Sequence, residues 1–129
     1  MAEYWNNIYL YNVYRDMRTV FSRELKKGST ELLILALLEP RPRHGYDLAK
    51  LIENRSGGRL ALRVGSLYPI LVRLEDRGLL TGRWVEKAGE RRRRFYRLTA
   101  QGRTVLAEQR SVWLDFTGSV NQILGGERA

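Results

Sequence analysis

The sequence contains no cysteine, a single histidine and only three prolines among its 129 residues. Without cysteine the chain can form neither a disulfide framework nor a thiolate metal site. The longest apolar run, residues 32–38, is far too short to span a bilayer, and residues 1–12 carry a glutamate where a secretory signal would carry basic residues. We therefore expect a cytoplasmic protein that does not enter a membrane.

Machinery for catalysis is also missing from the sequence. It contains no Ser/His/Asp set, no paired-carboxylate motif and no phosphate-binding glycine loop. The single histidine, His44, stands in a turn before an expected helix, where the role of a histidine is usually structural rather than metal-binding or catalytic. The sequence thus predicts a protein that is not an enzyme and that uses no metal or cofactor.

Positive charge, by contrast, is abundant and unevenly distributed. The formal net charge is +9, and residues 59–97 alone carry eleven basic against four acidic side chains, a net charge of +7. Such a concentration is the electrostatic footprint of a protein that binds a polyanion. A merely solvated basic surface is the alternative that composition leaves open.

The spacing of apolar residues predicts a mainly helical chain. Large apolar residues recur every four positions between residues 5 and 25, which predicts an amphipathic helix in residues 1–27 that packs either on a partner subunit or on its own domain. Residues 32–38 are apolar nearly all round and indicate a central core helix. After a further helix, residues 59–63 alternate charged and apolar side chains and predict a short strand.

Residues 66–77 predict a short helix with two different faces. Ser66 is the expected N-cap, Pro69 falls in the first turn, and Gly78 ends the helix. At about 100° per residue, one side is apolar and suited to the core: it gathers Leu67, Ile70, Leu71 and Leu74. The other side, which we expect to be functional, carries Tyr68, Pro69, Val72 and Arg73.

A basic β-hairpin is predicted next, over residues 83–98. Two β-prone stretches flank a glycine-containing turn, and four consecutive arginines, residues 91–94, lie at the turn and on the returning strand. Because side chains alternate along a strand, about half of these arginines should face each side. A basic ribbon beside a helix with a polar face is a recurring way to straddle a nucleic-acid duplex.

The last predicted helix, residues 99–124, has Thr99 as its N-cap and a seam of larger side chains at three- and four-residue steps. The seam is typical of a coiled coil and favours dimerisation over packing on the chain's own domain. It consists of Leu106, Gln109, Trp113, Phe116, Val120 and Ile123. Residues 125–129 are an expected frayed tail.

This order of elements is that of a winged helix-turn-helix, residues 28–98, followed by a long C-terminal helix. Within it, several stretches together resemble the PadR family of bacterial transcriptional regulators, in its branch with a short C-terminal part. They are the apolar run 32–38, HGYDL at 44–48, GSLYPILVRLE at 65–75, GLL at 78–80 and RRFYRLTAQG at 93–102. The resemblance implies a homodimeric repressor that binds an inverted repeat in double-stranded DNA.

The resemblance also implies where DNA would be bound. It assigns Ser66, Tyr68, Pro69 and Arg73 to the helix that enters the major groove, and Arg93 and Arg94 to the wing. The residues themselves suggest phosphate contacts for the hydroxyls of Ser66 and Tyr68, and for Arg63 and Arg92. Arg73 could equally read a guanine or hold a phosphate.

Two further interpretations stay open at this stage. Trp113 and Phe116 are expected in a dimer core, and alternatively they would line a pocket for a small planar aromatic effector. An RNA-binding or protein-interaction module built on the same fold is the alternative function. The arginine run disfavours a purely protein partner, since charged residues are depleted at interface cores.

Overall fold

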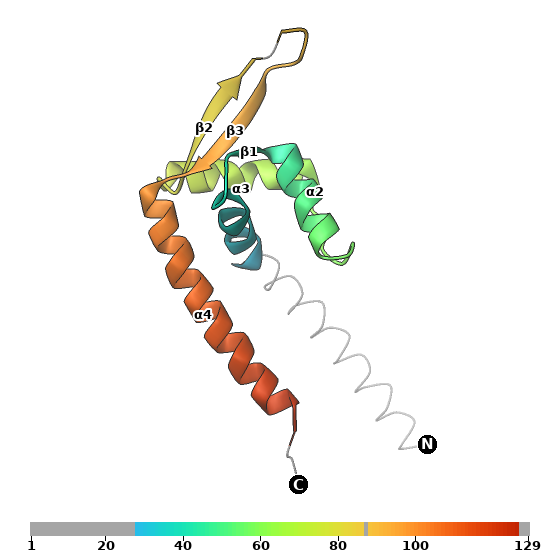
Figure 1. Cartoon of the computed structure of the whole chain (residues 1–129), viewed down its shortest axis with the longest axis vertical. Coiled ribbons are helices and arrows are strands. Elements are labelled where there is room, and N and C mark those ends of the chain that lie inside the picture. The colour runs from blue at the N-terminus through green and yellow to red at the C-terminus, as the bar shows by residue number, and fades with distance from the viewer. Residues whose placement is uncertain (1–27, 87, 127–129) are drawn as a thin grey trace, which may run out of the picture. The chain divides into compact units, whose positions relative to one another are not determined.

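The structure, a computed structural model, describes residues 28–86 and 88–126. The predicted amphipathic helix in residues 1–27 therefore lies outside the described residues. The chain divides into two compact units, residues 1–31 and residues 32–129, and the second carries the winged domain. Residues 28–38 are helical. The elements that follow are β1 (Arg43–His44), α2 (Gly45–Arg55), α3 (Val64–Asp76), β2 (Leu80–Val85), β3 (Arg93–Leu98) and α4 (Ala100–Leu124) (Figure 1).

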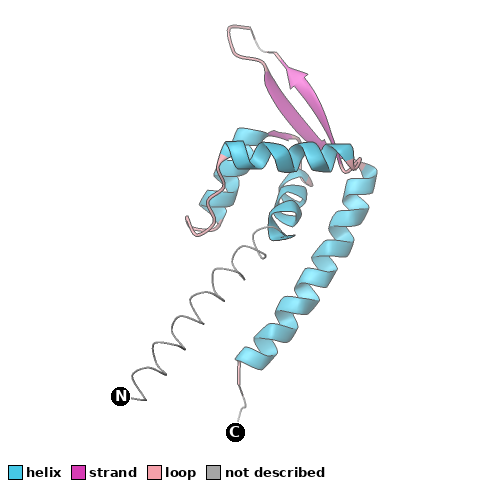
Figure 2. Cartoon of the chain, turned by 180° about the vertical axis from the view of Figure 1, so that it is seen from behind, coloured by secondary structure: helices cyan, strands magenta, loops and turns pink. Residues whose placement is uncertain are grey.

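The predicted fold class is confirmed, namely a mainly helical chain with a small antiparallel sheet. The sheet has the order β1-β3-β2, with Leu80 opposite Leu98 and Val85 opposite Arg93 in the β2–β3 hairpin. Figure 2 shows the hairpin extending away from the helices of the winged domain, as a wing does. Only the end of the hairpin near Leu80, Tyr96 and Leu98 is buried.

The core forms where the helices meet this buried end of the hairpin. Helix-forming leucines at three- and four-residue spacing bring their side chains together, and the strands close one side. The fully buried side chains are Ile34, Leu35, Leu38, Leu48, Leu67, Leu71, Leu74, Leu79, Leu80, Tyr96 and Leu106. The predicted apolar side of α3 is confirmed, with Ile70 half-buried at its margin.

The short strand predicted at residues 59–63 is wrong. Those residues form a bend and an irregular segment, whereas the third strand is β1, where Arg43 pairs with Tyr96 and His44 with Phe95. β2 occupies one edge of β3 and β1 occupies the other. Residues 59–63 pair with none of these strands, and a strand without a partner gains no ladder hydrogen bonds.

The predicted start of α3 at Ser66 is also wrong. The helix begins at Val64 with Arg63 as its N-cap, and no side chain caps it. The Arg63 carbonyl accepts the N–H groups of Ser66 and Leu67 at 3.0 Å each, so the first turn is closed by the main chain alone. Pro69 consequently lies within the helix rather than in its first turn.

The end of α3 and the start of α4 agree with prediction and are joined to each other. Gly78 has φ of +75°, and the N–H of Leu79 donates to the carbonyl of Leu74, which is the hydrogen bond of a Schellman C-cap. The Thr99 hydroxyl caps α4 by accepting from the N–H of Gly102 at 2.9 Å. The same hydroxyl donates to the Gly78 carbonyl at 2.7 Å and so connects the two helix ends.

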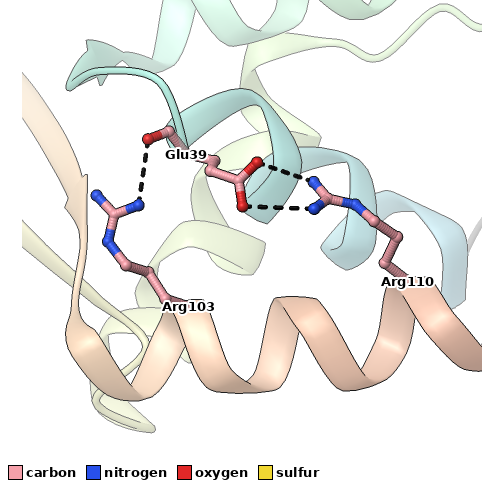
Figure 3. A network of polar contacts seen from close by, with 3 residues as sticks. All are labelled: Glu39, Arg103 and Arg110. Carbon is pink, nitrogen blue, oxygen red and sulfur yellow. Dashed lines mark hydrogen bonds and ion pairs between the residues drawn. The ribbon is translucent and has the colours of Figure 1, made fainter.

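Glu39, in the loop after the helical residues 28–38, holds the N-terminal half of α4. Arg110 reaches its two carboxylate oxygens at 3.1 and 3.4 Å, and Arg103 donates to its main-chain carbonyl at 3.3 Å (Figure 3). Both side chains of the ion pair are about two-fifths exposed, so its contribution to stability is modest. Its bidentate geometry nevertheless defines the direction in which α4 leaves the core.

The close packing of α4 on the strand ends gives a test of this arrangement. A Cβ at Gly102 would overlap the main-chain oxygen of Leu79 and lie 2.8 Å from a methyl carbon of Leu98. Gly102→Ala is expected to lower the free energy of unfolding by about 3 kcal/mol, because a backbone atom cannot move aside as a side chain can. Urea denaturation followed by circular dichroism measures this change.

Gly118→Ala is the matched control in the same helix, since nothing lies within 4 Å of the added Cβ. It should leave stability unchanged or raise it by up to about 1 kcal/mol. Equal effects of the two substitutions would contradict the packing of α4 described above.

Candidate nucleic-acid interface

A groove runs between the wing and the N-terminal ends of α2 and α3. Its cavity is about 410 Å³, and we call it the wing groove. Its lining is mostly aromatic and basic, with one glycine and one valine: His44, Gly45, Tyr46, Val64, Tyr68, Trp84, Arg91, Arg92, Arg93 and Arg94. Four guanidinium groups beside three half-exposed aromatic rings form a surface suited to a polyanion.

The predicted face of α3 borders this groove. Tyr68 is 42% exposed, and Arg63, Ser66, Pro69 and Arg73 are exposed as well. The opposite, apolar side of α3 packs on the core through Leu67, Leu71 and Leu74. Of the predicted residues Tyr68 lines the wing groove beside the wing arginines, and the others are exposed along the same helix.

Tyr68 lies close to Tyr96, which is buried on β3. Burial raises the pKa of Tyr96 to about 12, and Tyr68 adds to the rise through its charge and through a hydrogen bond, while Arg94 opposes it. The two phenols thus lie next to each other, with Tyr96 in the core and Tyr68 on the lining of the wing groove.

Among the wing arginines, Arg94 has a distinct position. Its Nη2 donates to Oε1 of Glu75 on α3 at 2.7 Å, and the same oxygen accepts the N–H of Gly82 on β2 at 3.1 Å. The Arg94 and Glu75 side chains are only 23% and 29% exposed. We call this three-residue contact the Glu75 bridge. Because it engages the charge of Arg94, this arginine differs from the wing arginines next to it.

The Glu75 bridge also explains the glycine at position 82. A Cβ at Gly82 would lie 2.5 Å from Nε of Arg94, so even alanine there would displace the guanidinium. Tyr96, opposite Gly82 on β3, has the Arg94 guanidinium 5.8 Å from its ring centre. The bridge therefore occupies space that a side chain on β2 would otherwise fill.

Arg92 and Arg93 have weaker contacts within the chain. Arg92 pairs with Glu86 at 3.2 Å, with both side chains more than half exposed, and its guanidinium lies 5.1 Å from the centre of the Trp84 ring. Nη1 of Arg93 lies 3.2 Å from Nε2 of His44. The exposed Arg92–Glu86 pair contributes little to stability and is readily exchanged for another anion, whereas the Arg93 contact reaches a buried imidazole.

The sequence of this chain matches the transcriptional regulator PadR-like family over residues 34–108. This match spans more than half of the chain. The protein belongs to the PadR-like family of transcriptional regulators.

Individual relatives agree with this assignment. The transcriptional regulator Rv3488 of Mycobacterium tuberculosis is 35% identical over 105 residues, which are 81% of this chain and 92% of that protein. A PadR family regulator of Eggerthella lenta is 30% identical with a TM-score of 0.72, covering 89% of this chain and 98% of that one. Bacillus subtilis PadR, solved in complex with operator DNA, is 26% identical with a TM-score of 0.57, covering 62% and 46% of the two chains.

The C-terminal helix of this PadR protein divides into two parts. Leu106 is fully buried in the core of its own chain and offers no surface to a partner. Beyond Arg110, apolar side chains are exposed, including Val112 at 69%, Phe116 at 56% and Ile123 at 79%. Gln109, Trp113 and Val120 are half-buried. The rings of Trp113 and Phe116 lie 6.4 Å apart at a tilt of 50°.

Sequence reasoning missed several members of the wing groove. Tyr46 and Trp84 are 51% and 50% exposed, which is unusual for rings of this size. Alternation along β2 could have placed Trp84 on the face of Arg94, its partner in the ladder. The approach of α2 to the wing depends on the β1–β3 pairing, which no local pattern signals.

The described part of the chain has neither a cluster of metal ligands nor a membrane-spanning helix. Within residues 28–86 and 88–126, no group of three or more His, Cys, Asp and Glu side chains could hold a metal ion. No helix in the same ranges is long and apolar enough to cross a membrane.

The Glu75 bridge gives a second test. Glu75→Gln keeps the size of the side chain but removes the charge that pairs with half-buried Arg94, so the free energy of unfolding should fall by about 1–2 kcal/mol. Glu86→Gln is the control, because the Glu86 pair with Arg92 is exposed and should contribute about 0.5 kcal/mol or less. Urea denaturation of both variants measures the two changes in the free energy of unfolding. Equal, small changes would show that the Glu75 bridge does not stabilise the wing.

Proposed function

We propose that this PadR-family protein is a DNA-binding transcriptional repressor that acts as a homodimer on an inverted repeat. In this proposal α3 enters the major groove and the β2–β3 hairpin contacts the flanking backbone as a wing. The observation that carries it is the wing groove, where four arginines adjoin the exposed face of α3. The operator-bound Bacillus subtilis PadR, a structural relative, supports it.

The contacts of single residues follow from their chemistry. Arg63, Ser66 and Tyr68 are proposed to donate to phosphate oxygens, which set the register of the helix on DNA. Pro69 shapes the same face, and Arg73 either donates to a guanine or holds a phosphate. Arg92 and Arg93 exchange their weak contacts within the chain for phosphates. Arg94 retains a role in the wing through Glu75, rather than the direct contact expected from the sequence.

A second copy of this chain is the proposed partner of α4. At 100° per residue, Val112, Phe116 and Ile123 lie on one side of the helix together with Gln109, Trp113 and Val120. Three large apolar side chains exposed on one face would gain free energy by burial against an identical face. Pairing through α4 would also set the distance between two copies of α3, which an inverted repeat requires.

The effector expected from the sequence stays a prediction. Phe116 is more than half exposed in the single chain, and it forms an open surface with Trp113. A pocket for a planar aromatic compound at these residues would therefore need walls supplied by the second subunit.

The salt dependence of DNA binding tests the wing. Arg92→Ala and Arg93→Ala should each weaken binding to duplexes of any sequence and reduce the slope of log K against log salt by about 0.9 for each phosphate that the variant no longer neutralises. Arg103→Ala, which removes the same charge from α4, should leave the slope unchanged. Fluorescence anisotropy with a labelled duplex gives these values.

Two results would count against this proposal. Unchanged slopes in both wing variants would remove the wing from the interface. Stronger binding to a single-stranded RNA of the same sequence than to the duplex would favour the alternative, an RNA-binding module.

The dimer is tested by charge on α4. Phe116→Asp should give a monomer and weaken binding to an inverted-repeat duplex, because a carboxylate cannot be buried unpaired at an apolar interface. Leu114→Asp is the control, since Leu114 is 60% exposed on the opposite side of the helix. Sedimentation equilibrium measures the mass, and a Phe116→Asp dimer would refute this interface.

A further inference from the structure

We infer that His44 is a positioning residue that couples DNA binding to the uptake of a proton, through its contact with Arg93. The inference rests on the proposed function, since it concerns how the wing groove receives a phosphate. It gives a role to a buried histidine that sequence reasoning treated as structural. His44 is also the only histidine in the chain.

One nitrogen of His44 makes two different contacts. Nε2 lies 3.2 Å from Nη1 of Arg93 on β3 and 3.3 Å from Oδ2 of Asp47 on α2. The arginine can only donate, so its contact requires Nε2 to be an unprotonated acceptor. The ionised carboxylate can only accept, so its contact is a hydrogen bond only when Nε2 carries a proton. The two contacts are therefore alternatives and define two states of the ring.

The surroundings of the ring keep it in place in both states. His44 is only 7% exposed; its ring stacks on Tyr46 at 6.2 Å and meets the edge of Phe95 at 5.4 Å. The neighbouring cation on β1, Arg43, donates through Nε to the main-chain oxygen of Leu37 at 2.7 Å and is thereby held in its own contact. Other charged groups near the ring are Lys50 on α2, whose Nζ lies 4.7 Å from the centre of the Tyr46 ring, and Arg91, Arg92 and Arg94, which line the wing groove with His44.

The state of the ring decides whether Arg93 is engaged within the chain. With Nε2 unprotonated, Arg93 is tied to His44. With Nε2 protonated, His44 donates a hydrogen bond to Asp47 instead. Repulsion between the imidazolium and the Arg93 guanidinium then releases Arg93 toward the groove. A phosphate in the groove attracts both Arg93 and the imidazolium, so it favours the protonated state. Binding should then take up a proton, and by linkage acid should strengthen binding.

The test measures the affinity of the full chain for a labelled mixed-sequence duplex as a function of pH. Between about pH 5.5 and about pH 7.5, where histidine is the only side chain that ordinarily titrates, Kd should fall with falling pH, by up to about tenfold per pH unit for each subunit. His44→Gln, which keeps an acceptor for Arg93 but cannot be protonated, should abolish this slope. Asp47→Asn, which removes the partner of the protonated ring, should move the response to lower pH.

Calorimetry of the unmutated protein supplies a second measurement that does not depend on the folding of a variant. Binding heats in two buffers with different ionisation enthalpies should show net uptake of up to about one proton per subunit. A flat pH profile in the unmutated chain, or a slope that survives His44→Gln, would overturn the inference. A flat profile would indicate that a neutral tautomer with its proton on Nε2 releases Arg93 instead.

The outcomes also separate this inference from the proposed function. Binding that is salt-dependent but independent of pH would leave the DNA-binding proposal intact and refute only the role of His44. Failure to bind the duplex at any pH would refute both.

Discussion

The arrangement of the proposed DNA-binding surface depends on one carboxylate oxygen. Oε1 of Glu75 accepts from Gly82 on β2 and from Arg94 on β3, so a single atom of α3 holds both strands of the wing. An isolated two-stranded hairpin is only marginally stable in water, and the outer part of the wing extends beyond the core (Figure 1). The Glu75 bridge therefore adds to the buried contacts of Leu80, Tyr96 and Leu98 in holding the wing next to α3.

This constraint changes the meaning of the arginine run. Four consecutive arginines look equivalent in the sequence, yet the fold gives them different tasks. Arg94 stabilises the wing through Glu75, Arg93 contacts His44, and Arg92 has an exposed pair with Glu86 and lies over the face of Trp84. Arg92 and Arg94 both lie over Trp84, and what separates them is that Arg94 reaches the Glu75 carboxylate on α3. A count of positive charges therefore overstates the number of groups available to a phosphate.

Local chemistry explains which features could be predicted from the sequence. The apolar side of α3, the glycine stop at Gly78 and the Thr99 cap depend on neighbouring residues, and all three are confirmed. The strand at Arg43–His44 depends on pairing with Tyr96 and Phe95 far along the chain, and local patterns missed it. The roles of Arg94 and His44 were equally hidden, because each needs a partner on another element. The exposed residues of α3 needed only helical periodicity.

The C-terminal helix shows the limit of such patterns most clearly. Its seam continues from Leu106 to Ile123 without a break in spacing, but the first member is buried in the chain's own core and the last is 79% exposed. The periodicity of a helix shows that one face is apolar, but it does not show which part of the protein or which partner covers that face. The helix face changes from buried to exposed near Arg110, the residue of α4 that pairs with Glu39. Because α4 continues as one helix from Arg110 to Leu124, a partner bound to its exposed face would be held at a defined distance from α3.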